Sequence, residues 1–290
     1  TDSVQYQPQS LRQEGQVVPA DAGVVVTKSV PRPTAFVLVS TDHGSMLVNR
    51  HDYRLTDKGG YGVGFQIFNT SSYDPDEVNV VLQLLETRRE NFGDGVVAVD
   101  CGANIGVHTI EWAKFMHGWG EVVAFEAQER IFYALAGNIT LNNCFNARAL
   151  WAAIGSENGV IRVPRLDYFT PSSFGSLEVR ETSNPENIGQ KVDYSDAGTQ
   201  LTSMVTIDGF NFPRLDFLKI DIEGMEMEAL KGAEKTIART HPQILVEKIK
   251  STETDITSFL SQLGYQIFPA GMNLLAIHES DPVAGSLGEV

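Results

Sequence analysis

The chain has 290 residues, 42% of them hydrophobic, which is enough for one sizeable core with an appendage or for two small domains. Its 22 Lys and Arg against 37 Asp and Glu give a net charge of −15, which argues against nucleic acid and anionic membranes as bulk partners. The only two cysteines, Cys101 and Cys144, exclude a cysteine-built zinc site, and no apolar run reaches the roughly 20 residues that cross a bilayer. Because no signal-peptide pattern is visible, we expect a cytoplasmic protein.

Residues 1–73 are expected to form an N-terminal extension that precedes the main domain. Residues 1–35 are rich in Gln, Ser, Pro and Val with weak periodicity, so we expect an extended arm. Two β-prone runs, 36–40 and 45–49, flank a short polar turn and predict a hairpin. The glycine-rich stretch 58–64 predicts a flexible joint.

The pattern changes at Asp74, where we expect a helix and the start of a second domain that covers 74–290. Asp74 is suited to cap the helix, Pro75 fits its first position, and Glu77 stands three residues after the cap. The apolar residues that follow have helical spacing: Val78, Val81, Leu82 and Leu85.

From residue 96 onward, predicted strands alternate with predicted helices. The strands are expected at 96–100, 121–126, 147–154, 217–221, 243–247, 265–269 and 274–278. The helices are expected at 104–117, 128–142, 225–239 and 252–263. This alternation predicts an α/β fold with a doubly wound, mostly parallel sheet, in which ligands bind off the carboxyl ends of the strands.

A glycine bend follows the first of these strands and indicates a cofactor site. Asp100 ends the strand, and Gly102, Asn104 and Gly106 form a G-x-N-x-G loop before the next helix. Asn104 crowds the place where the dinucleotide fingerprint needs a glycine, and Asp100 would repel a pyrophosphate. Free loop amides beside an acid suit a zwitterion, and Glu126 at the next strand tip suits a ribose diol. Together these features predict S-adenosyl-L-methionine.

A second signal lies in the sequence FLKIDIEGMEMEALKGA, residues 217–233. Its strand delivers Asp221 and Glu223 to the same edge of the sheet. Glu223 needs no functional explanation, because acidic side chains near a helix N-terminus are stabilised by the helix dipole. Asp221 ends a hydrophobic central strand, where an unpartnered carboxylate is costly, so we expect it to meet a ligand or a cation.

These motifs, taken with AFEAQ, NITLNN, AAIGSENG and PQILVEK, resemble the FkbM-type S-adenosylmethionine-dependent methyltransferases over about residues 75–280. The resemblance implies the class I, Rossmann-like methyltransferase fold, with a seven-stranded sheet closed by an antiparallel last strand. It implies methyl transfer to an oxygen, commonly a hydroxyl of a sugar or natural product. It also assigns the cofactor residues Asp100, Gly102, Asn104, Gly106 and Glu126, and places Asp221 and Glu223 beside the methyl group.

The chain departs from the family pattern at three places. Ala127 follows the ribose acid where proline is usual, and Thr206-Ile207-Asp208 replaces the usual Thr-Leu-Asp. The stretch 165–200 is longer than typical, and we expect it to form a lid over the acceptor. Its segment 172–176 (SSFGS) offers hydroxyls and a glycine.

The histidines are sorted by their position in the expected topology. His108 follows the glycine loop in the first turn of the next helix. Two interpretations are equally consistent with this position: a contact with the cofactor, and an ordinary histidine on a helix face. His241 and His278 are expected at the far edge of the sheet, while Asn273 is expected on the active side. Trp151 is expected in the core rather than beside the adenine. Three histidines are expected at the surface: His43, His51 and His117.

The predicted function is an S-adenosylmethionine-dependent O-methyltransferase that acts on a small hydroxylated acceptor. Asp221 and Glu223 are the predicted catalytic pair, with Glu247 in reserve as the proton acceptor. A magnesium site at these three carboxylates is the minority interpretation, since the sequence shows no tight acidic cluster. Two alternatives stay open: a nicotinamide-dependent oxidoreductase, and a module that binds the cofactor without catalysis. The acceptor and the oligomeric state do not follow from the sequence.

Overall fold

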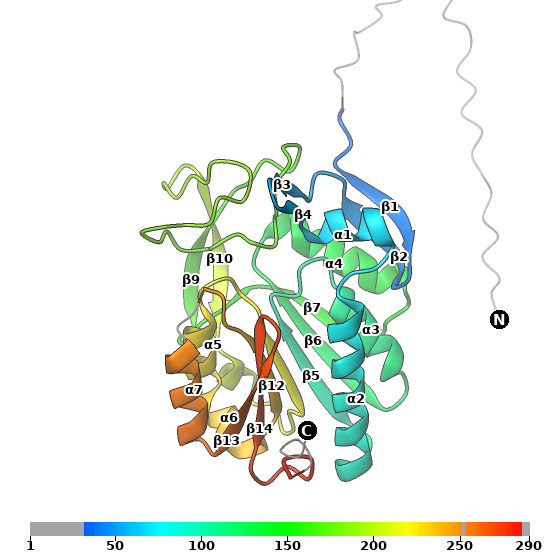
Figure 1. Ribbon diagram of the computed structural model, residues 1–290, viewed down its shortest axis with the longest axis vertical. Helices are drawn as coiled ribbons and strands as arrows, with labels where there is room; N and C mark the ends of the chain where they lie inside the picture. Colours follow the sequence, from blue (N-terminus) through cyan, green and yellow to red (C-terminus); the bar gives the residue numbers. More distant parts are fainter. Residues whose placement is uncertain (1–31, 251–252, 286–290) are drawn as a thin grey trace, which may run out of the picture. The chain divides into compact units, whose positions relative to one another are not determined.

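The computed structural model of the chain describes residues 32–250 and 253–285, and the described residues from Thr34 onward belong to one compact unit. Residues 1–31, where most of the extended arm was expected, lie outside the described part. Figure 1 shows a central sheet with helices on both of its faces. The predicted α/β fold is therefore confirmed.

The central sheet has seven strands in the described part of the chain, in the order β13-β14-β12-β11-β5-β6-β7. Six of them run in the same direction, and β14 enters antiparallel between β12 and β13. The strands are β5 Val96–Cys101, β6 Gly120–Glu126, β7 Ala147–Trp151, β11 Phe217–Ile220, β12 Gln243–Glu247, β13 Tyr265–Ala270 and β14 Asn273–His278. The predicted mostly parallel sheet with an antiparallel last strand is confirmed.

The two faces of the sheet carry different sets of helices (Figure 1). On β5, Val96 and Ala98 pack toward one hydrophobic cluster, while Val97 and Val99 pack toward the other. Because side chains alternate along a strand, a strand covered on both faces is apolar throughout. One face carries α2 Pro75–Phe92, α3 Val107–Phe115 and α4 Glu129–Leu141, and the other carries α5 Glu226–Gly232, α6 Glu234–Thr240 and α7 Glu253–Gln262.

The predicted helix over 225–239 is wrong in one respect, since it is divided at Ala233 into α5 and α6. Two contacts explain the division. A Cβ on Gly232 would lie 2.0 Å from the carbonyl oxygen of Gly155, so the chain passes very close there. Asp208 then accepts hydrogen bonds from the Thr236 backbone N–H at 2.8 Å and the Thr236 hydroxyl at 2.7 Å, which stabilises the start of α6.

The predicted third strand, 147–154, is also divided, because its end joins a second sheet. β8 Ala153–Ile154 pairs parallel with β10 Thr199–Val205, which pairs antiparallel with β9 Gly159–Pro164. A short 3-10 helix, η1 Ile207–Phe210, follows β10. The connection from β9 to β10, residues 165–198, contains no helix or strand of its own.

The N-terminal region contains the expected hairpin and more. β1 Phe36–Thr41 pairs antiparallel with β2 Gly44–Asn49, which confirms that hairpin. The expected flexible joint at 58–64 is wrong: β3 Arg54–Thr56 and β4 Gly59–Tyr61 form a second hairpin, and α1 Val63–Thr70 follows it. Val63 and Ile67 stand four residues apart and are buried together, so α1 packs through one apolar face.

The start of α2 also differs from the sequence prediction. Asp74 is the residue before the helix, but it adopts a left-handed conformation with φ 41° and its side chain makes no capping hydrogen bond. Glu77, expected to complete the cap, instead turns toward the carboxyl edge of the sheet, where Asn273 donates to it at 2.6 Å.

Candidate active site

A cavity of about 580 Å³ opens at the carboxyl ends of β5, β6, β11 and β12. The glycine loop, the tips of these strands and parts of the N-terminal region all contribute to its walls. In a sheet of this topology the central parallel strands all end at one edge, so residues far apart in sequence meet there. All but two of the sequence-predicted site residues line this cavity. Asp100 and Gly106 do not, although the neighbours of Gly106, Ile105 and Val107, do. The lining residues are Gly102, Asn104, His108, Glu126, Ala127, Asp221, Glu223 and Glu247.

The glycine loop needs its glycines for close packing. Gly102 has φ 83°, and a Cβ there would lie 1.7 Å from the carbonyl oxygen of Asp221, so only glycine lets the loop pass the tip of β11. Gly106 has φ 92°, and a Cβ there would lie 2.5 Å from Leu135 of α4. Asn104 also has positive φ, at 51°, as expected for a residue that tolerates this conformation.

The backbone amides of residues 102–106 are used inside the protein, so the prediction that they are free for a ligand is wrong. The N–H groups of Gly102 and Ala103 both donate to the Phe125 carbonyl, and that of Gly106 donates to Ala103. The remaining two amides, of Asn104 and Ile105, donate to the Glu126 carboxylate at 3.0 Å and to the Asn104 side chain at 2.8 Å. These bonds fix the shape of the loop before any ligand arrives.

Asp100 lies beneath the loop rather than in the cavity wall. Its side chain is fully buried and accepts from the Thr109 hydroxyl at 2.6 Å. Its second oxygen, Oδ1, is buried without a hydrogen-bond partner among the described residues. Burial raises the pKa of Asp100, although Lys219 and Thr109 oppose that shift. Asp100 therefore supports the loop, and a direct contact with the cofactor stays a prediction.

Glu126 ends β6 and faces the cavity from a nearly buried position. Its two oxygens accept from the backbone N–H groups of Asn104 at 3.0 Å and Gln128 at 2.7 Å. Burial raises its pKa to about 7, and these two hydrogen bonds oppose the shift. A carboxylate oxygen carries more than one lone pair, so Glu126 can still accept from hydroxyls of a ligand in the cavity. Ala127 continues the wall beside it.

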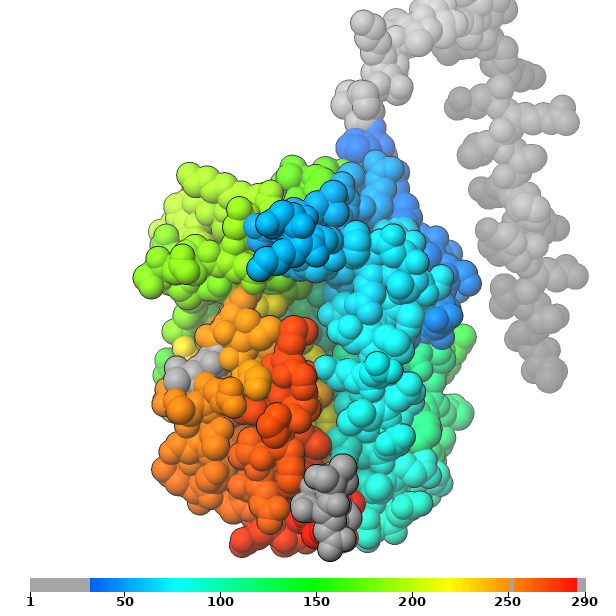
Figure 2. Space-filling view, viewed as in Figure 1, coloured from blue at the N-terminus to red at the C-terminus, as the bar shows by residue number. Residues whose placement is uncertain are grey.

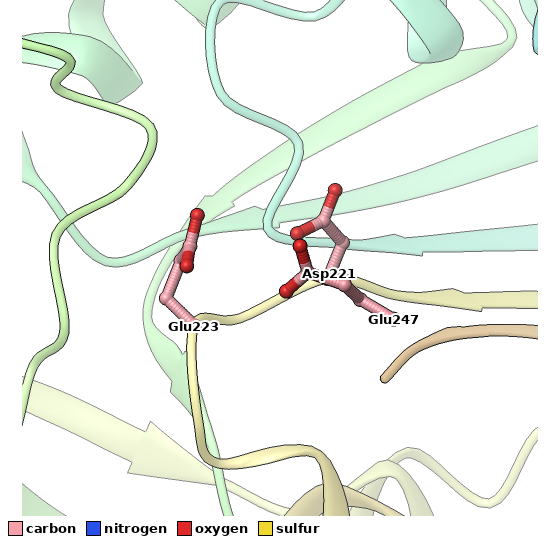
Figure 3. Close-up of side chains that lie close together, drawn as sticks. All are labelled: Asp221, Glu223 and Glu247. Carbon is pink, nitrogen blue, oxygen red and sulfur yellow. The ribbon is translucent and has the colours of Figure 1, made fainter. Parts of the chain in front are cut away.

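Three carboxylates gather at the tips of β11 and β12. Asp221, Glu223 and Glu247 each place one oxygen within 4.8 Å of the others. Figure 3 shows the Asp221 and Glu247 carboxylates side by side, with Glu223 to one side. Glu223 has φ 58° in the turn after β11, and the buried Glu226 holds this turn by accepting from the Ile222 and Gly224 N–H groups at 3.1 and 3.0 Å. The sequence prediction that no tight acidic cluster forms is therefore wrong.

Two of these three carboxylates have ammonium partners. Lys219 Nζ lies 2.8 Å from Asp221 Oδ2, and Lys250 Nζ lies 2.5 Å from Glu223 Oε2. Asp221 was expected to meet a ligand or a cation, and Lys219 is such a cation. Such spacing would also suit a divalent cation, but the two lysines already neutralise two of the three charges.

Glu247 forms no ion pair in the described part of the chain, and its Oε2 is buried without a hydrogen-bond partner there. Burial raises its pKa strongly, and the neighbouring Asp221 and Glu223 raise it further. Burial also raises the pKa of Glu223, against the pull of Lys250. The cluster therefore holds at least one carboxyl that keeps its proton near neutral pH.

His108 lies in the cavity wall, with Nε2 3.3 Å from Glu77 Oε1. Burial, and then the charge of Lys219, lowers the pKa of His108 well below its ordinary value, so the imidazole is neutral. Its Nδ1 is buried and unpartnered among the described residues. Glu77 was predicted only as a capping residue of α2, so its place in the cavity wall was missed.

The remaining aromatic predictions have mixed outcomes. His241 and His278 stack on each other with ring centroids 3.6 Å apart, and neither lines the cavity, as predicted. His43, expected at the surface, is buried and accepts from the Tyr73 N–H at 2.8 Å. Trp151, expected in the core, is 36% exposed and donates to the Ala127 carbonyl.

The sequence analysis did not predict that two distant segments both line the cavity. Residues 60–73, here called the N-terminal wall, contribute side chains that include Tyr61, Phe65 and Tyr73. Residues 173–186 contribute from the β9–β10 connection. Figure 2 shows the blue N-terminal elements adjoining the green connection. Tyr61 donates to Glu186 at 2.9 Å across this junction.

Asp52 also joins the two segments. Its carboxylate accepts from the backbone N–H groups of Gly64 at 3.0 Å and Phe174 at 3.1 Å. The apolar residues Val63 and Ile67 have helical spacing and could have indicated α1. The glycines at 59, 60 and 62 led instead to the prediction of a flexible joint.

Similarity to known proteins agrees with this geometry. The family model described as the methyltransferase FkbM domain matches residues 100–267, which is more than half of the chain. The matched segment contains the glycine loop, Glu126 and the three carboxylates. Among the described residues, no helix combines the length and apolarity that a membrane crossing requires.

Two fungal proteins and a bacterial structure are similar to the chain. "Methyltransferase sdnD" of Sordaria araneosa is 25% identical over 193 residues, which cover 58% of this chain and 73% of that protein. "Methyltransferase 1" of Beauveria bassiana is 27% identical over 154 residues, covering 49% of this chain and 59% of that protein. The crystal structure of methyltransferase FkbM from Methylobacillus flagellatus KT superposes with a TM-score of 0.43 and 22% identity, over 64% of this chain and 43% of that one.

The chain thus spans less than two thirds of the Beauveria protein and of the Methylobacillus chain. The family match overturns the oxidoreductase alternative, because it covers the cofactor loop and the acidic strand tips together. By its sequence match and its sheet, the chain belongs to the FkbM family of methyltransferases.

Proposed function

We propose that the protein transfers the methyl group of S-adenosyl-L-methionine to a hydroxyl oxygen of a small acceptor. The observation that carries this proposal is that the preformed glycine loop, Glu126 and three strand-tip carboxylates share one cavity. When bound, the cofactor supplies an electrophilic methyl group on a positively charged sulfonium.

The cavity wall fits such a cofactor. Glu126 offers carboxylate oxygens for the ribose hydroxyls, and the first turn of α3 brings Val107 and His108 to the wall. Ala152 and Ala153 after β7 leave space for a flat base. Asp221 lies at the adjacent strand tip, where its charge favours a cation.

The carboxylates also suit removal of the acceptor proton. An alcohol attacks faster as its proton departs, and a base is most effective when its pKa lies near the working pH. Burial raises the pKa of Glu223 toward that range, which favours it as the base. Asp221 is held by Lys219 and serves the positive charge, while Glu247 holds its proton until a cation lowers its pKa.

Single substitutions test this assignment. Asp221→Asn and Glu223→Gln should each lower kcat by about 10²–10⁴, while Glu247→Gln should lower it less. Glu228→Gln is the matched control, because Glu228 pairs with Arg180 outside the cavity. Calorimetry with S-adenosylhomocysteine should show that Glu223→Gln still binds the cofactor product.

Wild-type turnover by both Asp221→Asn and Glu223→Gln at saturating acceptor would refute the assigned roles and direct the search to Glu247 and His108. Absence of S-adenosylhomocysteine binding to the wild-type protein would refute the proposed function itself.

A further inference from the structure

We infer that the acceptor is an uncharged or cationic hydroxylated compound with an apolar body, and that the cavity disfavours phosphorylated and carboxylated acceptors. This inference rests on the proposed function. It concerns the part of the cavity beyond the three carboxylates, here called the acceptor compartment. Its side chains come from the N-terminal wall, the β9–β10 connection and the loops after β12 and β13: Tyr61, Phe65, Glu186, Ile249, Lys250 and Met272.

The charges around the cavity are mostly negative. Seven acidic side chains of the described residues line it, against two lysines and no arginine. One lysine, Lys219, is buried on the cofactor side, where Asp221, Asp100 and Glu77 all raise its pKa. Its charge is therefore offset by three carboxylates and lies away from the acceptor compartment.

Lys250 is the cation of the acceptor compartment, and its ammonium group has no hydrogen left to donate. An ammonium carries three N–H donors. Lys250 Nζ lies 2.5 Å from Glu223 Oε2, 3.0 Å from Glu186 Oε2 and 2.9 Å from the Ser176 carbonyl oxygen. An anionic acceptor would have to displace one of these three oxygen atoms from Lys250, and at least one of the two carboxylates would still face it beside the same ammonium group.

The compartment also presents apolar surface. Ile249 and Met272, which line the compartment, are 56% and 62% exposed, and Tyr61 and Phe65 also belong to its lining. Burial of a ligand's apolar body against such side chains is favourable, whereas a phosphate or carboxylate gains nothing from them. Charge and apolarity therefore select the same class of acceptor.

The test uses three catechols that differ in the charge of one side chain: 4-ethylcatechol is neutral, dopamine is cationic and 3,4-dihydroxyphenylacetate is anionic. The protein is first saturated with S-adenosylhomocysteine, and that binding is measured separately. The methyl groups of its six methionines are labelled with carbon-13, and Met272→Leu identifies the signal of the compartment. Ionic strength is kept constant, since screening would weaken the discrimination.

We expect 4-ethylcatechol and dopamine to shift the Met272 signal at concentrations at least about tenfold lower than 3,4-dihydroxyphenylacetate does. Glu186→Gln, which releases one donor of Lys250, should narrow that difference, whereas Glu181→Gln, at an exposed position outside the cavity, should not. Equal or tighter binding of the anion overturns the inference, and so does the failure of all three compounds to shift Met272. A failure of S-adenosylhomocysteine to bind would instead count against the proposed function.

Discussion

Lys219 and Asp221 stand two residues apart at the end of β11 and form an ion pair of 2.8 Å between Nζ and Oδ2. The lysine side chain is 5% exposed and the aspartate 36% exposed, so the pair lies at the boundary between core and cavity. Asp100 and Glu77 also direct their charge at Lys219. One ammonium group thus offsets the charge of three carboxylates near the carboxyl edge of the sheet.

Lys219→Met should therefore destabilise the protein. Removal of one partner of a buried pair costs about 3–5 kcal/mol, and because water screens the partly exposed Asp221 we expect about 1–3 kcal/mol. Urea unfolding measures this difference. Lys248→Met is the control, since Lys248 pairs loosely with Glu253 at 3.5 Å, and should cost less than about 1 kcal/mol. Equal stability of both variants would show that the carboxylates do not depend on Lys219.

Glu126→Ala should weaken S-adenosylhomocysteine binding by about 1–3 kcal/mol, because the ribose hydroxyls lose a carboxylate acceptor. The variant also frees the Asn104 and Gln128 amides that Glu126 holds, so the loop shape is disturbed. Isothermal titration calorimetry measures the affinity. Glu121→Ala, at the exposed start of the same strand, should bind like the wild type. Unchanged affinity of Glu126→Ala would remove Glu126 from the site.

The stability of the cofactor-free protein should fall as pH rises. Burial raises the pKa of Asp52 to about 6 and of Glu126 to about 7, so the folded state holds these protons more tightly than the unfolded chain. Their contribution is complete below about pH 4 and is lost as pH rises through about 6 and 7. At 1.36 kcal/mol per pKa unit, each carboxyl contributes about 3 kcal/mol to that loss.

Urea titrations at about pH 5 and pH 8, at constant ionic strength, measure this fall. Asp52→Asn and Glu126→Gln should each reduce it, whereas Glu121→Gln should leave it unchanged. A free energy of unfolding that increases over this range would contradict the prediction.

The predicted lid, 165–200, should show two kinds of hydrogen exchange. Ser172, Ser173 and Phe174 are buried, and the Phe174 amide donates to Asp52, so this part should exchange slowly even without ligand. Residues 180–185 are exposed, and we expect their exchange to slow when cofactor product and acceptor are both bound. Equal exchange of 180–185 in free and doubly bound protein would argue against a lid.

The sequence predicted the sheet well because its signals are local. Three of its strands, β6, β11 and β12, are short and mostly apolar runs with an acid at or directly after the end. The topology of parallel strands then brings Glu126, Asp221 and Glu247 to one edge. In that sheet β11 pairs in parallel with both β5 and β12.

The contacts between distant segments could not be read in this way. Glu77 has the spacing of a capping residue, yet it meets Asn273 across 196 positions, and no local pattern encodes such a pair. The loop amides at 102–106 have internal acceptors that only the folded neighbours supply, as Phe125 and Glu126 do. The division of the helix at Ala233 depends likewise on Gly155 and Asp208.

Two residues, Asp52 and Tyr61, join the N-terminal wall to the β9–β10 connection, and their hydrogen bonds differ in the partners that they need. Asp52 binds backbone N–H groups of Gly64 and Phe174, which nearly every residue type provides. Tyr61 binds the Glu186 side chain, which a substitution removes at once. A substitution of Glu186 therefore leaves the two segments joined by Asp52. The matched family segment begins at residue 100, so this junction joins Asp52 and Tyr61, which precede the segment, to Phe174 and Glu186, which lie within it.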